Sequence, residues 1–311
     1  MRPKNHQGVF LIGIDLGSNT LRAVSLDAKF ERKGAFERIV RTAEGLDQSG
    51  LISPNALERI LSALAELRER FDLSEPYEAV ATAALRRAKN QKEILLALEK
   101  RGGIAFRVID AQEEATLTAL AAQGALKRLG IEQEFVMVDI GGSSTEVLFF
   151  RRGEMISQSF EMGILTFKER YGISHGLESK LYEIGSEIKE FARDMIHSGF
   201  KPELFVGVGG TPATLASLKA GMSYASYDYQ KIEGMKLTPP LIKKELEKLL
   251  RLPLKERERL AGAGKSELLE VGVKIFETLF LALGFRECLI VDDSLREGVA
   301  ISALKKATQQ N

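Results

Sequence analysis

The residues best suited to chemistry lie where an apolar run ends in an aspartate followed by a glycine-rich turn. Residues 139–146 read Asp-Ile-Gly-Gly-Ser-Ser-Thr-Glu and follow the apolar residues 135–138. Glycines and small hydroxyl residues allow a tight turn whose successive backbone N–H groups form a concave anion site. The Asp139 carboxylate at the strand end can hold Mg²⁺, which offsets phosphate charge. The alternative is a plain β-hairpin in which glycine only supplies a positive φ.

Two further glycine-rich turns follow apolar runs elsewhere in the chain. Residues 15–20 read Asp-Leu-Gly-Ser-Asn-Thr and repeat the aspartate, glycine and hydroxyl order of the first turn. Residues 207–214 read Gly-Val-Gly-Gly-Thr-Pro-Ala-Thr and lead into a predicted helix, whose N-terminal N–H groups favour an anion. One such turn is explained equally well by strand-to-helix packing, but three turns after three buried strands predict phosphate binding.

A pair of glutamates is the strongest candidate for acid–base chemistry. Glu113 and Glu114 open the predicted helix 112–129. Successive helical residues lie about 100° apart, so at most one of the two side chains faces a ligand, where it could act as a general base. The alternative is that both only complement the helix dipole.

Three arginines near these motifs are candidates for binding a polyanion. Arg22 follows the first turn along the chain, and Arg86 and Arg87 follow the predicted strand 77–82. In isolation each fits a solvated surface. Beside three anion sites they become candidates for gripping phosphate, because a guanidinium binds it through two hydrogen bonds.

Alternating strands and helices must position these residues. Strands are predicted where short apolar runs or period-two alternation occur, and helices where apolar residues repeat at helical spacing. The predicted strands cover residues 9–15, 21–26, 36–42, 77–82, 104–109, 135–140, 146–150, 155–160, 204–208 and 288–291. The predicted helices include one that begins at Ser53-Pro54 and others at 112–129, 177–197 and 295–305. Because the pattern begins again at residue 135, we expect two similar α/β domains that face each other across a cleft.

Composition narrows the class of protein. The 311 residues carry 44 Lys and Arg against 43 Asp and Glu, and this net charge of +1 excludes the overall basic field of many nucleic-acid-binding proteins. A single cysteine, Cys288, excludes an internal disulfide, and the spacing of the three histidines argues against a zinc site. No apolar stretch reaches the roughly 18 residues of a membrane-spanning helix, so we expect a cytoplasmic protein that binds neither membrane nor nucleic acid.

Taken together, these motifs resemble the exopolyphosphatase / guanosine pentaphosphate phosphatase family of the actin-like ATPase superfamily. The matching segments follow the family order along almost the whole chain, at residues 15–22, 81–90, 113–115, 139–146, 207–214 and 292–298. The resemblance implies an α/β fold of two actin-like, ribonuclease H-like domains. We place their limits at residues 1–128, completed by 292–311, and at 129–291.

The resemblance also implies a reaction and the residues that perform it. Glu114 matches the general base that activates water, and Asp139, Glu146 and Asp15 are the expected ligands of Mg²⁺ or another divalent cation. The implied reaction releases terminal orthophosphate from inorganic polyphosphate, with guanosine pentaphosphate as a further substrate. The implied phosphate-binding residues are Ser18, Asn19, Arg22, Arg86, Arg87, Gly141, Gly142, Ser143, Ser144, Thr145, Gly209, Gly210 and Thr211.

The chain departs from the family pattern at three places. Ser143 stands at the third glycine of the family loop, Glu233 at a histidine, and Lys265-Ser266-Glu267 at an Arg-Ala-Asp sequence. Two alternatives therefore stay open: a phosphate-ligand sensor that has lost turnover, and an ATP-dependent small-molecule kinase of the same superfamily. The sequence does not rank polyphosphate against guanosine pentaphosphate, and it leaves a homodimer open.

Overall fold

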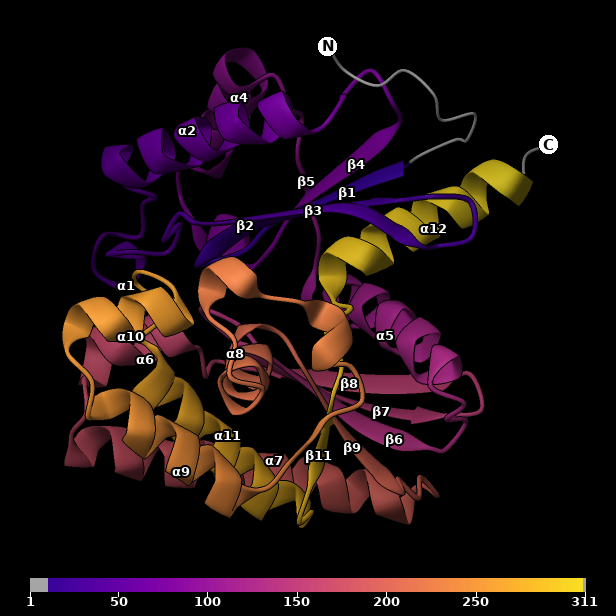
Figure 1. Ribbon diagram of the computed structural model, residues 1–311, viewed down its shortest axis with the longest axis vertical. Coiled ribbons are helices and arrows are strands. Elements are labelled where there is room, and N and C mark those ends of the chain that lie inside the picture. The colour runs from indigo at the N-terminus through magenta and orange to yellow at the C-terminus, as the bar shows by residue number, and fades with distance from the viewer. Residues whose placement is uncertain (1–10, 310–311) are drawn as a thin grey trace.

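Two β-sheets form the frame of the molecule, and five strands of the second sheet repeat the order of the first (Figure 1). The computed structural model describes residues 11–309 and the side chains of residues 11–304. The first sheet has the order β3-β2-β1-β4-β5, with β1 Leu11–Leu16, β2 Thr20–Leu26, β3 Arg32–Ile39, β4 Tyr77–Ala81 and β5 Arg107–Val108. The second has the order β8-β7-β6-β9-β11-β10, with β6 Phe135–Ile140, β7 Thr145–Arg151, β8 Glu154–Phe160, β9 Leu204–Val208, β10 Lys236–Leu237 and β11 Cys288–Ile290.

The two sheets share a five-strand topology, and the second has β10 as an additional antiparallel strand at its edge. In each, three antiparallel strands form a meander whose first strand then pairs in parallel with the next strands along the sheet. Asp15 lies on β1 of the first sheet and Asp139 on β6, the corresponding strand of the second. The structure thus confirms the predicted α/β class and the predicted duplication.

Helices cover both sheets and follow the apolar periodicity of the sequence. Ser53 caps one of them, because its side chain accepts a hydrogen bond from the Ala56 N–H at 3.1 Å, and Pro54 occupies the first helical position. The helices are α1 Leu46–Ser49, α2 Pro54–Arg70, α3 Ala83–Arg87, α4 Gln91–Gly102, α5 Ala111–Arg128, α6 Ile164–Tyr171, α7 His175–His197, α8 Gly210–Lys219, α9 Pro239–Leu250, α10 Leu254–Ala261, α11 Leu269–Leu283 and α12 Leu295–Gln309.

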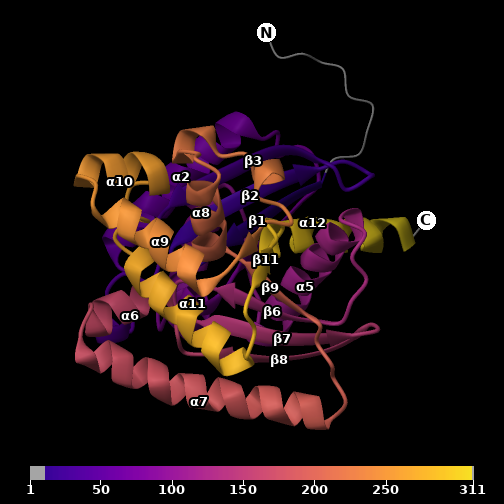
Figure 2. The same ribbon diagram turned by 60° about the horizontal axis from the view of Figure 1, so that its bottom comes forward.

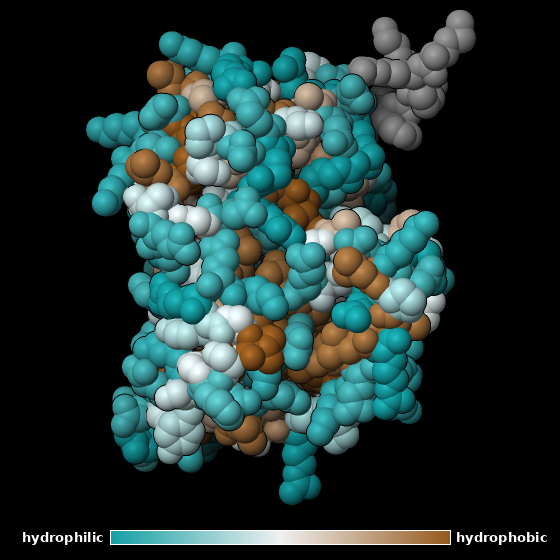
Figure 3. Space-filling model, turned by 90° about the vertical axis from the view of Figure 1, so that its left-hand side faces the viewer, coloured by the Kyte–Doolittle hydropathy of each residue, from teal (hydrophilic) through white to brown (hydrophobic). Residues whose placement is uncertain are grey.

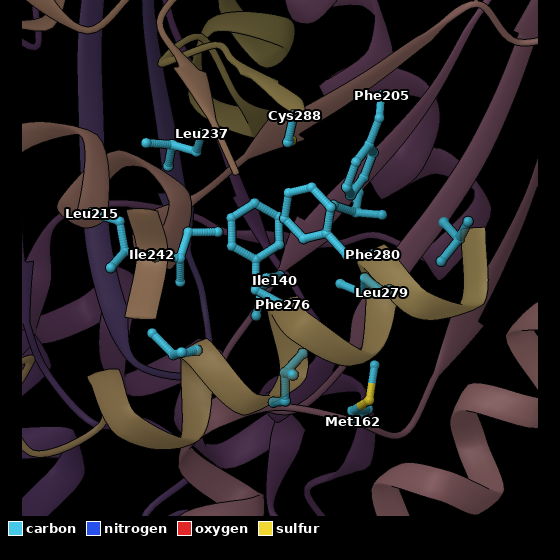
Figure 4. Close-up of a cluster of buried hydrophobic side chains, with 14 of the residues drawn as sticks. Ile140, Met162, Phe205, Leu215, Leu237, Ile242, Phe276, Leu279, Phe280 and Cys288 are labelled. Atoms are coloured by element: carbon cyan, nitrogen blue, oxygen red, sulfur yellow. The ribbon is translucent and has the colours of Figure 1, made fainter. Parts of the chain in front are cut away.

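The second sheet has the larger apolar core. Aromatic side chains from β9 and α11 meet there, with ring centroids 5.0 Å apart both for Phe205 and Phe280 and for Phe276 and Phe280 (Figure 4). Cys288 lies in this core, fully buried and reduced. The long helix α7 packs along α11 on the outer side of this core (Figure 2). Polar side chains cover most of the molecular face shown in Figure 3, and apolar side chains appear between them in patches.

Helices α5 and α12 join the two sheets. α12 packs on β1 and β2, α5 packs on β7 and β8, and the two helices contact each other (Figure 1). Glycines allow this close approach: a Cβ at Gly298 would lie 1.9 Å from the Leu117 carbonyl oxygen, and a Cβ at Gly13 would lie 2.1 Å from the Arg296 carbonyl oxygen. An element late in the chain therefore completes the cover of the first sheet. The predicted domain limits stay a prediction.

Some elements differ from those predicted. The strand expected over 104–109 shortens to β5, because the chain leaves α4 through Gly103 at φ +73°, and Ile104 and Phe106 are buried in the first core without sheet pairing. The short helices α3 and α6 were not predicted. Residues 9 and 10 of the first predicted strand lie outside the described residues. Within the described part of the chain, no helix has the length and apolarity needed to span a bilayer.

Candidate active site

A cavity of about 80 Å³ lies between the ends of β1 and β6 and the start of α8. Most of the predicted site residues line it. They are Asp15, Ser18, Asn19, Arg22, Glu114, Asp139, Gly141, Gly142, Ser143, Ser144, Glu146, Gly209, Gly210 and Thr211. Thr145 lies beside the cavity, and its hydroxyl donates to the Met162 carbonyl at 2.5 Å, which fixes the end of the turn.

The two aspartate-glycine turns close in the same way and face each other. The Gly17 N–H donates to the Thr20 carbonyl and the Gly141 N–H to the Ser144 carbonyl, each at 2.9 Å. A Cβ at Gly142 would lie 2.9 Å from the Ser18 Cβ, so a larger residue at position 142 would push the two turns apart. The duplication therefore brings two potential anion-binding turns into direct contact across the cleft.

Helix α6 supports the second turn from outside the cavity. The Ile164 N–H donates to the Gly141 carbonyl at 3.0 Å, and the Leu165 N–H donates to the Gly142 carbonyl at 2.9 Å. These bonds occupy carbonyl groups of the turn, whereas the N–H groups of residues 142–144 have no acceptor within residues 11–309. Unpaired amides beside a cavity are the donors that an anion requires.

The third turn approaches the second sheet closely at Gly209. This residue has φ +86°, and a Cβ there would lie 2.4 Å from Oδ1 of Asp139, so only glycine fits without displacement. Gly210 and Thr211 then begin α8. Because the first N–H groups of a helix have no partner inside it, this end of α8 presents further donors to the cavity.

Three carboxylates are buried at the cavity. Burial raises the pKa of Asp139 to about 7, with Glu146 and Asp15 adding to the rise and Arg22 opposing it. Burial also raises the pKa of Asp15, although Arg22 binds its Oδ2 at 2.6 Å. Burial likewise raises the pKa of Glu146, whose Oε1 accepts hydrogen bonds at 2.8 Å from the hydroxyls of Ser144 and Ser159.

The carboxylates at the cavity suit a cation that is coordinated mainly by phosphate oxygens of a substrate and by water. Within the described residues, no three His, Cys, Asp or Glu side chains come together as a metal cluster, so Asp139, Glu146 and Asp15 do not form a ready three-ligand site. Oδ1 of Asp15 is nevertheless buried without a hydrogen-bond partner. Mg²⁺ typically uses one or two carboxylates together with water and phosphate oxygens. The carboxylates present fit that mode of binding.

Glu113 and Glu114 point to different surroundings. Glu114 lines the cavity with a side chain 12% exposed, and its Oε2 accepts a hydrogen bond from Arg86 at 2.7 Å. Glu113 is 39% exposed and pairs with Arg107 at 2.7 Å. Burial and the nearby Glu146 raise the pKa of Glu114 well above its usual value, and Arg86 offsets part of this rise. A buried carboxylate with a raised pKa can accept a proton near neutral pH.

The three arginines that were predicted to bind a polyanion already hold carboxylates. Arg22 lines the cavity and binds Asp15. Arg86 binds Glu114 and also donates a hydrogen bond to the Ile109 carbonyl at 2.8 Å. Arg87 binds Asp47 at the surface. Arg86 and Arg87 are not among the residues that line the cavity, so in this structure only Arg22 reaches it directly.

Two charged residues that were not predicted as site residues, Glu37 and Lys265, also line the cavity. Glu37 of β3 lies directly opposite Arg22 of β2 in the antiparallel register, and it pairs with Lys265, which precedes α11. The cross-strand position of Glu37 beside Arg22 was the available signal. Lys265 was noted only as a departure from a family motif, and its contact with a residue 228 positions away could not be read from the sequence.

A second cavity of about 540 Å³ adjoins the first. Its walls combine cations, among them Arg32 and Arg70, with the aromatic rings of Tyr224, Tyr227 and Tyr229. Arg32 lies over the ring of Tyr229, 3.9 Å from the ring centre. The walls of this cavity could therefore contact both charged and planar groups.

The other two departures from the family pattern are Ser143, which lies at the first cavity, and Glu233, which lies outside both cavities. Ser143 lines the first cavity, and its hydroxyl oxygen is buried without a partner, as is Oδ1 of Asn19. A bound group or water would complete such atoms. Glu233 lines neither cavity; its Oε2 accepts a hydrogen bond from the Asp292 N–H at 2.9 Å.

Comparison with known proteins finds relatives in sequence and in structure. A sequence model of the Ppx/GppA phosphatase family matches residues 31–307. Exopolyphosphatase 2 of Mycobacterium tuberculosis is 28% identical over 320 aligned residues, which cover 93% of this chain and 97% of that protein. The crystal structure of the Aquifex aeolicus Ppx/GppA family member superposes with a TM-score of 0.70 at 28% identity, over 97% of this chain and 99% of that one. An exopolyphosphatase from Cytophaga hutchinsonii shares the fold, with a TM-score of 0.81 at 22% identity over 96% and 98% of the two chains.

Proposed function

The chain belongs to the Ppx/GppA phosphatase family, and from this membership we propose that it hydrolyses the terminal phosphoanhydride bond of inorganic polyphosphate. The observation that carries the proposal is the composition of the first cavity. One wall holds Glu114, a buried carboxylate with a raised pKa, and the others hold the free amides of two glycine-rich turns and a helix start. This arrangement suits a water molecule activated next to a bound phosphate.

In the proposed reaction, Glu114 accepts a proton from water while the water oxygen attacks the terminal phosphorus atom. The bond from that phosphorus to the bridging oxygen breaks, orthophosphate leaves, and the chain is one phosphate shorter. Amides of residues 142–144 and of Gly210 and Thr211 would hold the phosphate oxygens in line with the attacking water. Arg86 would keep Glu114 oriented through its hydrogen bond to Oε2, which leaves Oε1 for the water.

We further propose that Mg²⁺ takes part in substrate binding. Asp139 and Asp15 would hold it, because Asp15 has an unpartnered buried oxygen and both side chains line the cavity. When bound, the cation offsets phosphate charge. Glu146 fits this role less well, because two serine hydroxyls already bind its Oε1.

Guanosine pentaphosphate is the second candidate substrate. The observation that favours it is the second cavity, in which Tyr224, Tyr227 and Tyr229 offer aromatic surface next to the phosphate-binding turns. Such surfaces contact the planar bases of nucleotides. The nucleoside would occupy the second cavity while its terminal phosphate occupied the first.

The test is phosphate release from polyphosphate, guanosine pentaphosphate and ATP, measured side by side with and without Mg²⁺. We expect release from polyphosphate with Mg²⁺ and little release after chelation. Tight polyphosphate binding without release would support a sensor instead, and consumption of ATP only with an added acceptor would support a kinase.

A further inference from the structure

The second cavity continues from the first along β3, the edge strand of the first sheet. The residues that line both cavities form their junction, and they are Arg22, Glu37, Gly209, Gly210, Thr214 and Lys265. From Glu37 at this junction, every residue of β3 back to Arg32 lines the second cavity. A strand of this length spans about 17 Å. A substrate whose terminal phosphate occupies the first cavity therefore has room to extend along β3.

The walls of the second cavity carry more cations than carboxylates. Six Arg and Lys side chains line it, against the two carboxylates of Glu37 and Asp292. Five of these cations already bind carboxylates, and they are Arg22, Arg32, Lys33, Lys265 and Arg296. Arg70 differs from them, because no carboxylate or other acceptor binds its guanidinium within residues 11–304. Its charge is therefore available to a ligand in this cavity.

Arg70 is held at the cavity by its place in the fold. It is the last residue of α2, and its guanidinium lies over the ring of Phe36, 5.5 Å from the ring centre. Phe36 is buried and belongs to β3, so this contact ties the arginine to the strand that the cavity follows. A guanidinium on a ring face keeps the N–H donors at its own edge, where two of them can bind one phosphate.

A purely structural role for Arg70 is the alternative explanation of its position. A basic side chain in the last turn of a helix complements the helix dipole. Arg68 lies in the same turn of α2 and provides that interaction too, but it lines neither cavity. The two arginines therefore share their effect on the helix and differ in their access to the second cavity.

We propose that Arg70 is a specificity-determining residue that binds an internal phosphate of polyphosphate in the second cavity and thereby favours long chains. This inference rests on the proposed hydrolysis of polyphosphate. Arg70 does not line the first cavity, so it does not contact the terminal phosphate. Its contribution is made only to a chain long enough to reach it along β3. The wild type should therefore bind long-chain polyphosphate more tightly than tripolyphosphate at equal concentrations of chain ends.

The experiment measures KM for polyphosphates of increasing length, from tripolyphosphate upwards. In Arg70→Gln, KM for long chains should rise about fivefold, the upper end for an exposed ion pair, while KM for tripolyphosphate and kcat stay within about twofold. Arg70→Lys keeps the positive charge and should retain most of the affinity for long chains. The matched control is Arg68→Gln, which should change KM at no chain length.

Calorimetric binding in a Glu114→Gln background gives a readout without turnover. There, Arg70→Gln should weaken the binding of long chains and leave the binding of tripolyphosphate unchanged. An equal rise in KM at every length, or the same rise in Arg68→Gln, would overturn the inference, as would a wild type that prefers tripolyphosphate. An inactive wild type would instead refute the proposed hydrolysis, and a length-dependent loss of binding in Arg70→Gln would still support the role of Arg70.

Discussion

Glu114 and Glu113 show how two adjacent identical residues acquire different roles from their surroundings. Glu114 is buried at the cavity beside Arg86, whereas Glu113 reaches solvent and Arg107. Glu114→Gln should lower kcat about 10²- to 10⁴-fold, because the amide cannot accept the proton of the attacking water. Glu113→Gln should leave kcat nearly unchanged. Phosphate release at saturating Mg²⁺ measures both, and equal losses in the two variants would refute Glu114 as the base.

The pH profile gives a separate test of Glu114. Burial and Glu146 raise its pKa well above the ordinary 4.5, and a general base works only in its deprotonated form. We therefore expect kcat/KM to fall as the pH is lowered through this raised pKa, so that the acid limb lies well above pH 4.5. The residual activity of Glu114→Gln should lack this limb. A profile that is flat down to pH 4.5 would contradict the assignment.

Glu233 should make the stability of the protein depend on pH. Burial, together with Asp293 and Asp292, raises its pKa from 4.5 to about 7. A raised pKa means that the folded state binds the proton more tightly than the unfolded state does. Protonation of Glu233 therefore stabilises the folded state below pH 4.5, and this stabilisation is lost as the pH rises towards 7. Glu233→Gln should therefore stabilise the protein by up to about 3 kcal/mol above pH 7 and change little near pH 4.5.

Thermal unfolding of wild type and Glu233→Gln across this pH range measures the effect. Glu203→Gln is the control, because its carboxylate lies at the surface. A stability difference that does not change with pH would show that the substitution acts through packing instead of titration.

At the scale of elements, the start of α6 fixes the shape of the turn after β6. A Cβ at Gly163 would lie 2.3 Å from the Cα of Ser143 and 2.4 Å from the backbone carbon of Gly142. Gly163→Ala should displace this turn, with a loss of about 10²-fold in kcat/KM and about 1–3 kcal/mol in unfolding free energy. Enzyme kinetics and chemical denaturation check these two values.

Gly124→Ala provides the matched control for the glycine at position 163. Gly124 lies inside α5, and the nearest atom to an added Cβ there is a flexible Arg128 nitrogen at 3.8 Å. Alanine favours a helix over glycine, so this variant should be slightly more stable and fully active. A Gly163→Ala enzyme as active as this control would show that α6 does not hold the turn.

The sequence predicts the elements that carry strong local patterns. Residues 135–140 and 204–208 form β6 and β9 with the predicted bounds, since continuous apolar runs that end at glycine turns define buried strands. The five-residue helix α3 and the two-residue strand β10 are too short to show a period. Their conformation depends on neighbours distant in the chain, and no local pattern reports those neighbours.

The candidate site was predictable to a similar degree. The glycine-rich turns could be predicted from their composition, and the topology places them around one cavity. The partners of Arg22, Arg86 and Arg87 were not predictable, because a sequence does not state which carboxylate each guanidinium meets after folding. For the same reason, the pairing of Glu37 with Lys265 could not be predicted from the sequence.

At the scale of the whole molecule, ion pairs join the two halves beside the cleft. Asp47 of α1 binds Arg170 of α6, and Arg41 binds Glu267 at 3.1 Å. Surface pairs of this kind contribute about 0.2–1 kcal/mol each and are screened by salt. Asp47→Asn should therefore loosen the contact between the halves and lower kcat/KM about two- to fivefold, measured by phosphate release at low ionic strength.

A distance measurement separates this opening from direct effects on substrate binding. Because the only cysteine, Cys288, is buried, Glu69→Cys on α2 and Glu190→Cys on α7 can be labelled selectively for energy transfer. We expect the distance between the labels to increase with salt in the otherwise unchanged protein, and to be increased already at low salt after Asp47→Asn. An unchanged distance under both conditions would show that these pairs do not hold the halves together.

The position of α12 affects how the chain folds while the ribosome makes it. The apolar side chains of Leu11, Val24 and Leu26 on β1 and β2 pack against Ala300 and Ile301 of α12. The ribosome synthesises β1 and β2 first, then the whole second sheet, and α12 only afterwards. Until α12 has been synthesised, the apolar face of the nascent first sheet therefore lacks its cover, and exposed apolar surface of this kind favours aggregation or chaperone binding. The cleft can reach its final form only after translation has passed α12.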